Sequence, residues 1–139
     1  MIIGYVLAPT LEAKYTIEAL QQAISHAGSG NLCGTIHHSD RGVQYCCDEY
    51  ITLLKEHHIR ISMTEDSNPT DNGMAERVNG IIKNEFLEPL PTPKNLLEAM
   101  PIVDHAIRTY NTLRPHLSLN MRTPAQVYEE NNNFQKLKV

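Results

Sequence analysis

Two acidic residues, Asp40 and Glu76, are the leading candidates for chemistry in this sequence. Asp40 lies in a polar turn, residues 39–42, directly after a predicted strand, and Glu76 lies in the first turn of a predicted helix. Open α/β sheets bind ligands beyond the carboxyl ends of their strands, and carboxylate oxygens suit Mg²⁺ or Mn²⁺. Capping and the helix dipole favour acidic residues at the same positions. The pattern alone therefore leaves a metal site and a structural role open.

Thiol and imidazole groups give a weaker indication of a metal site. The three cysteines are Cys33, Cys46 and Cys47, an odd number with two members adjacent, and the seven histidines include two adjacent pairs. No Cys-x2-Cys or His-x3-His spacing is present, so the pattern does not favour zinc. Reduced, packed thiols and ordinary surface or core histidines are the preferred interpretation.

The hydrophobic pattern predicts the elements that position these side chains. β-rich and alternating runs predict three strands, over residues 1–8, 32–37 and 59–63. Helical spacing predicts five helices: 13–27 capped by Thr10, 47–58, 74–87, 95–110 kinked at Pro101, and 124–130. Turn-forming residues 64–73 predict an exposed, mobile loop. This order is typical of a small α/β layer with a helical C-terminal half.

Composition limits the class of protein. The chain has 139 residues, 41% of them hydrophobic, and a net charge of −4, which predicts one globular core without a membrane span. No export signal is recognised, so a cytoplasmic location is expected. Four basic and nine acidic residues fall in 1–75, against eight and seven in 76–139. We therefore expect any phosphate-binding surface in the second half.

Four motifs in one order resemble the integrase core of bacterial insertion-sequence transposases, relatives of the retroviral integrases. The resemblance covers nearly the whole chain and rests on His38-Ser39-Asp40-Arg41-Gly42-Val43-Gln44-Tyr45, Asp71-Asn72-Gly73 with Glu76, Lys83 and Glu85, Tyr110-Asn111-x-x-Arg114-Pro115-His116, and Thr123-Pro124. In that family the second catalytic aspartate and the glutamate are separated by 35 intervening residues, and residues 41–75 form the same gap here. The resemblance implies an RNase H-like three-layer α/β fold, with a core over residues 1–130 and a polar tail over 131–139.

The resemblance also implies roles for individual residues. Asp40 and Glu76 match two members of the catalytic Asp-Asp-Glu set, which holds Mg²⁺ or Mn²⁺ in a two-metal site. DNA is the implied partner, and a homo-oligomer is expected. Lys83, Arg77, Asn79 and Arg114 are the candidate DNA contacts. A solvated surface lysine remains an equal alternative for Lys83, and a structural turn remains one for Arg114.

One departure from the family pattern concerns the first catalytic aspartate. No aspartate precedes Asp40, and in family terms the sequence starts at the third strand of the sheet. We therefore expect a catalytic-core fragment that binds metal weakly and is inactive in DNA cleavage and strand transfer. The strand expected at residues 1–8 would have an unpaired edge that favours dimerisation. A degenerate DNA-binding or dimerisation module, or another RNase H-like nuclease, remains an alternative.

Overall fold

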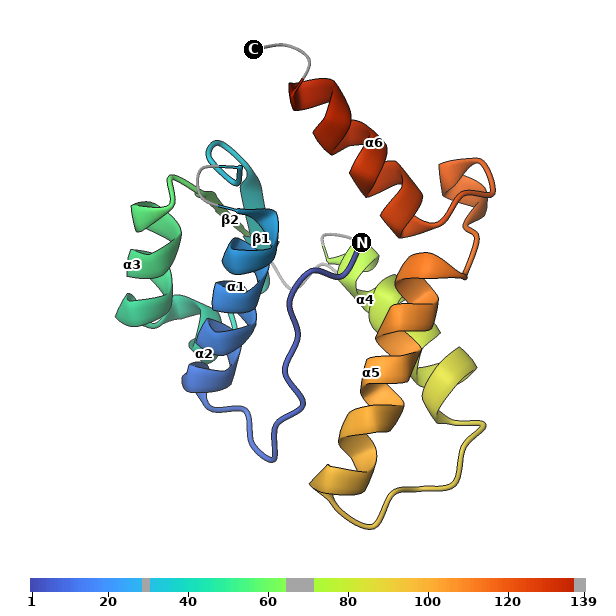
Figure 1. The fold of residues 1–139 in the computed structure, drawn as a ribbon. Coiled ribbons are helices and arrows are strands. Elements are labelled where there is room, and N and C mark those ends of the chain that lie inside the picture. Colours follow the sequence, from blue (N-terminus) through green and yellow to red (C-terminus); the bar gives the residue numbers. More distant parts are fainter. Residues whose placement is uncertain (29–30, 65–71, 137–139) are drawn as a thin grey trace. The chain divides into compact units, whose positions relative to one another are not determined.

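The computed structural model describes residues 1–28, 31–64 and 72–136 (Figure 1). The chain divides into two compact units, Ile3–Asn79 and Met1–Ile2 with Gly80–Val139. Each unit has its own helices and its own buried residues. The helices within the described ranges include none that is both long and apolar enough to span a membrane.

The unit Ile3–Asn79 is built around two parallel strands, β1 (Ile36–Ser39) and β2 (Arg60–Met63). They pair in register from Ile36 with Arg60 to Ser39 with Met63. The chain passes from β1 to β2 through two helices, α2 (Val43–Cys46) and α3 (Asp48–Glu56), and α1 (Ala13–Ala27) precedes β1. Parallel strands need such a crossover, because a tight turn cannot join them.

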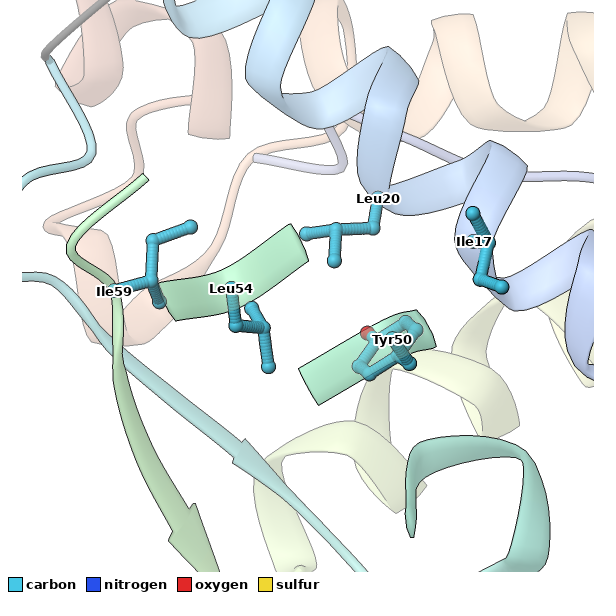
Figure 2. Packing of buried hydrophobic residues seen from close by; sticks show 5 residues of the cluster. All are labelled: Ile17, Leu20, Tyr50, Leu54 and Ile59. Carbon is cyan, nitrogen blue, oxygen red and sulfur yellow. The ribbon is translucent and has the colours of Figure 1, made fainter. Parts of the chain in front are cut away.

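The core of this unit lies between α1, α3 and the start of β2. Figure 2 shows its five buried side chains, Ile17 and Leu20 from α1, Tyr50 and Leu54 from α3, and Ile59 just before β2. The members from α1 and α3 recur every three or four residues, so each helix presents one apolar side. The predicted apolar stripes of both helices are thereby confirmed.

The second unit is helical. The chain runs from α4 (Gly73–Ile81), which crosses the unit boundary, into the π-helical η1 (Ile82–Leu87), then α5 (Leu96–Thr112), η2 (Leu117–Leu119) and α6 (Pro124–Lys136). Its buried apolar residues, Ala106, Ile107 and Tyr110, lie in the second half of α5. In the first half, Leu97 is 80% exposed, so the apolar stripe predicted over the whole helix is buried only toward its end.

Capping residues fix where α5 and α6 begin. The Asn95 side chain accepts a hydrogen bond from the Glu98 backbone N–H at 3.0 Å. Before α6, Thr123 and Gln126 form a reciprocal pair, each side-chain oxygen accepting from the other's backbone N–H. This is the capping-box arrangement, with Pro124 at the first helical position, where its missing N–H is not needed. The start of α6 predicted from Thr123-Pro124 is confirmed.

The strand predicted over residues 1–8 is wrong, because these residues form neither helix nor strand. A strand requires a neighbouring strand, and among the described residues β1 and β2 pair with each other. Side chains bind this segment's backbone instead: Asn111 binds both the N–H and the C=O of Ile2, and Gln22 accepts from the Tyr5 N–H. Its β-rich composition does not suffice without a strand partner.

Other boundaries differ from the predicted ones for local reasons. The strand predicted over 32–37 is β1 at Ile36–Ser39, because Gly34 has φ of 78° and residues 31–34 form a turn. The residue capping α1 is Glu12 and not Thr10. α6 continues to Lys136, past the end predicted at 130. Most of the loop predicted over 64–73 lies outside the described residues.

Candidate active site

Asp40 occupies the predicted position directly after β1. Its Oδ1 atom accepts a hydrogen bond of 2.9 Å from the Gly42 backbone N–H, a turn in which an aspartate fixes the backbone two residues further on. The side chain is otherwise exposed. One carboxylate oxygen, Oδ1, therefore holds the turn, and Oδ2 takes no part in this hydrogen bond.

The turn requires glycine at position 42, because there is no room for a Cβ atom there. A Cβ atom at residue 42 would lie 2.9 Å from Asp40 Oδ1 and 2.5 Å from Gln44 Nε2. The first of these contacts involves the atom that closes the turn, so a larger residue would displace the carboxylate. The glycine of the motif thus serves the geometry of Asp40.

The turn is also tied to the end of β2. Arg41 Nε donates a hydrogen bond of 2.8 Å to the Thr64 carbonyl, and the Thr64 N–H donates to the Ser39 carbonyl at 3.1 Å. These bonds extend the β1–β2 pairing by one step beyond the sheet. Arg41 therefore has a structural role beside the candidate catalytic aspartate.

An aromatic cluster supports β1 from the side covered by α3. His37 Nε2 and the Tyr50 hydroxyl are 2.9 Å apart, and the rings of Tyr45 and Tyr50 meet edge to face at 5.6 Å. Burial lowers the pKa of His37 and raises the pKa of Tyr50 to about 12. Both groups are therefore neutral near pH 7, and the histidine acts as packed support for the strand that carries Asp40.

Glu76, Arg77 and Asn79 are exposed on α4, and Glu76 lies in its first turn as predicted. The Glu76 N–H donates to the Asn72 carbonyl at 3.1 Å. Within the described residues, no group of three or more His, Cys, Asp or Glu side chains gathers into a metal site. Asp40 and Glu76 belong to the same unit, Ile3–Asn79.

Lys83 lies on η1, where the helix widens. The Glu88 N–H donates to the Lys83 carbonyl at 2.8 Å, five residues apart, as in a π-helix. The Lys83 ammonium lies 3.9 Å from the Glu88 carboxylate, and both side chains are mostly exposed. An exposed pair at this distance is weak, so the ammonium is free to exchange partners.

Arg114 has a definite partner within its unit. Its guanidinium donates two hydrogen bonds of 2.6 Å to the Glu85 carboxylate, and its Nη1 lies 3.3 Å from His116 Nδ1. These hydrogen bonds lower the pKa of Glu85, while burial lowers the pKa of His116. This geometry favours the structural role for Arg114 that the sequence left open.

The sequence alone predicts no specific role for Glu85 or His37. Glu85 was part of a motif, but its pairing with a residue 29 positions away has no local signal. His37 was expected only to be packed or solvent-facing, and its hydrogen bond to Tyr50 spans 13 positions. Both contacts depend on tertiary structure.

Comparison with known proteins gives the family context. Residues 57–124 match the family model described as the integrase core domain. The transposase for insertion sequence element IS629 of Shigella sonnei is 35% identical over 86 residues, 62% of this chain and 28% of the relative. A 31 kDa protein of insertion element IS600 from the same species is 32% identical over 130 residues, 93% of this chain and 47% of the relative. The chain spans less than half the length of these relatives.

Solved structures show the same fold. The catalytic core of BIV integrase has a TM-score of 0.68 at 20% identity, covering 94% of this chain and 80% of that one. The HTLV-2 integrase catalytic core in complex with magnesium has a TM-score of 0.60 at 26% identity, covering 83% and 68%. The protein is an integrase-core relative of the insertion-sequence transposases and has an RNase H-like α/β fold. The predicted family and fold class are confirmed.

Proposed function

We propose that this chain is part of the catalytic core of a DNA transposase, with Asp40 and Glu76 as two of its catalytic carboxylates. The proposed reaction of the whole protein cleaves at the ends of an insertion sequence and joins the freed 3′-hydroxyl to target DNA by in-line phosphoryl transfer. The observation that supports this most directly is Asp40, an exposed carboxylate fixed at the carboxyl end of a parallel strand. That edge of an α/β sheet is where ligands bind.

The donor groups suit a hard divalent cation. Asp40 has one oxygen, Oδ2, outside its turn hydrogen bond, and Glu76 is exposed. Mg²⁺ is commonly bound through one or two carboxylates, with water and phosphate oxygens completing its shell. A bound Mg²⁺ or Mn²⁺ would neutralise phosphate charge and activate the attacking oxygen. With no aspartate before Asp40 in the sequence, we expect weak binding by these two residues.

The remaining site residues would act on the DNA backbone. Lys83, Arg77 and Asn79 are exposed, and their side chains are suited to bind phosphate oxygens. A phosphate contact by Arg114 would require Glu85 to release the guanidinium. We further propose that the protein is cytoplasmic and self-associates, and that the DNA partners are the ends of the element and its target.

Mn²⁺ binding to the chain itself tests the assignment. Electron paramagnetic resonance of free Mn²⁺ would give affinities for the wild type, Asp40→Asn and Glu76→Gln, with Asp48→Asn and Glu18→Gln as exposed acidic controls. We expect both site variants to weaken binding more than about tenfold, since losing even an outer partner of a metal ligand costs that much. The controls should bind as the wild type does. Equal binding by all five proteins would contradict the site.

Product analysis distinguishes transposition chemistry from hydrolysis. Labelled DNA incubated with the chain and Mn²⁺ would yield joined strands from a transferase and only shortened strands from an RNase H-like nuclease. Glu76→Gln should abolish any such activity while leaving the melting temperature nearly unchanged. Full activity in that variant would overturn the role of Glu76.

A further inference from the structure

The two residues that flank Asp40 in the sequence both bind the backbone of Thr64, which directly follows β2. On one side, the Ser39 carbonyl accepts a hydrogen bond of 3.1 Å from the Thr64 N–H. On the other side, Arg41 Nε donates a hydrogen bond of 2.8 Å to the Thr64 carbonyl. The candidate catalytic aspartate is therefore fixed on both sides by a single residue at the end of the neighbouring strand.

The bond from Arg41 takes the place of a backbone hydrogen bond of the sheet. The register of β1 and β2 ends with Ser39 and Met63, so its next step would pair Asp40 with Thr64. In a parallel pair, a residue donates its N–H to the residue before its partner, and its carbonyl accepts from the N–H of the residue after that partner. The Thr64 N–H makes the first of these bonds with a backbone group, whereas a side-chain nitrogen, Arg41 Nε, makes the second. The Arg41 side chain thus completes the last step of the ladder.

This arrangement lets the chain leave the sheet at Asp40 while the aspartate stays fixed. β1 ends at Ser39, and the Gly42 N–H donates to Asp40 Oδ1 at 2.9 Å and not to a strand. Ser39 is held by burial, with 6% of its surface exposed, whereas Arg41 is exposed. An exposed segment with few buried contacts opens easily unless hydrogen bonds hold it. On the exposed side of Asp40, the bond from Arg41 to Thr64 does what burial does at Ser39.

We propose that Arg41 is a positioning residue for metal binding, which holds Asp40 in place through its Nε–H and not through its positive charge. The inference rests on the proposed function, in which Asp40 is a metal-binding carboxylate, and names the group that orients it. Hydrogen-bonded partners of a ligating carboxylate fix its orientation and so raise the affinity for the metal. The guanidinium charge repels a cation bound nearby. Removal of the charge alone should therefore not weaken metal binding.

Two neutral side chains of equal length separate the hydrogen bond from the charge. In Arg41→Gln, the amide nitrogen lies as many bonds from the backbone as Nε does and can donate to the Thr64 carbonyl. In Arg41→Met, a methyl group takes that place. By electron paramagnetic resonance of free Mn²⁺, Arg41→Gln should bind at least as tightly as the wild type, and Arg41→Met about tenfold more weakly. Arg60→Met removes an exposed arginine at the opposite end of β2 and should not weaken binding.

A double-substitution cycle distinguishes positioning from a general loss of structure. In the Asp40→Asn background, Arg41→Met should no longer change the Mn²⁺ affinity, because its effect passes through the Asp40 carboxylate. Equal affinities of Arg41→Gln and Arg41→Met would overturn the inference. An undiminished effect of Arg41→Met beside Asp40→Asn would overturn it as well.

Amide hydrogen exchange reports on the orientation of Asp40 without any metal. The Gly42 N–H, which is bound to Asp40 Oδ1, should exchange several times faster in Arg41→Met than in the wild type, and at the wild-type rate in Arg41→Gln. Unchanged exchange of Gly42 in Arg41→Met would overturn the positioning role. Equal Mn²⁺ affinities of the wild type and Asp40→Asn would instead overturn the proposed metal site, and the exchange of Gly42 would still decide whether Arg41 fixes the turn.

Discussion

The Arg114 guanidinium binds the Glu85 carboxylate through two hydrogen bonds, one from Nε and one from Nη2, each of 2.6 Å. The pair joins the π-helical segment η1 to the segment between α5 and η2. Since the Arg114 side chain is only 25% exposed, this pair is better shielded than an ordinary surface ion pair. The family motif around Arg114 therefore has a structural function in this unit.

Loss of the two-bond geometry should destabilise the protein. Arg114→Lys keeps the charge but cannot form the planar pair of hydrogen bonds. We expect the free energy of unfolding to fall by about 1 kcal/mol, because the pair is partly exposed. Urea denaturation would measure this, with Arg108→Lys, at an exposed site on α5, as the matched control. Equal losses in the two variants would argue against a structural role for the pair.

Stability should depend on the protonation of His37. Burial lowers the pKa of the folded imidazole below its usual 6.5, so between these two pKa values the unfolded chain binds more protons. The free energy of unfolding therefore falls as the pH decreases from about 7.5 to about 5.5. His37→Gln should reduce this slope. Part of the slope should persist from His116, whose pKa is lowered too. An unchanged slope in His37→Gln would show that this histidine does not contribute.

Two glycines should respond in opposite ways to substitution by alanine. A Cβ at Gly4 would collide with the Ala19 carbonyl and lie 2.9 Å from the Ala23 backbone nitrogen, whereas one at Gly80 meets nothing within 4 Å. Gly4→Ala should cost about 1–3 kcal/mol through overpacking, and Gly80→Ala, within α4, should stabilise by roughly 1 kcal/mol. Thermal unfolding of both variants checks the pair. A stabilised Gly4→Ala would mean that residue 4 does not pack against α1 in solution.

We expect Lys83 to contribute to DNA affinity through a salt-dependent contact with a phosphate group. Lys83→Gln is expected to weaken binding to all sequences alike and to reduce the slope of log affinity against log salt by about one, since one phosphate contact is lost. Fluorescence anisotropy with a labelled duplex over a salt series would measure the slope. Lys55→Gln, on α3, is the control. An equal change of slope in both variants would indicate that DNA responds to the net charge of the protein and not to a binding site at Lys83.

The elements that could be predicted are those whose signals are local. Ile17 and Leu20 recur at helical spacing, and Thr123 begins a helix by contacts within four residues. The position of Asp40 after a strand and of Glu76 in a first helical turn followed from the same kind of evidence.

The features that could not be predicted depend on distant residues. Residues 1–8 have a strand's composition, yet no described strand lies beside them to complete a ladder. The partner of Arg114 is set by how η1 packs, and the hydrogen bond between Tyr50 and His37 is set by how α3 packs beside β1. Propensity and periodicity carry no information about such pairs.

The hydrogen bonds between Asn111 and Ile2 have a consequence for variation of the sequence. One amide group donates to the Ile2 carbonyl and accepts from its N–H, as a neighbouring strand would do at a single residue. Both hydrogen bonds of Asn111 are made to backbone atoms of Ile2, and neither involves its side chain. Position 2 should therefore accept most amino acids, with proline as the exception because it lacks the N–H, whereas position 111 needs a side-chain amide of this length.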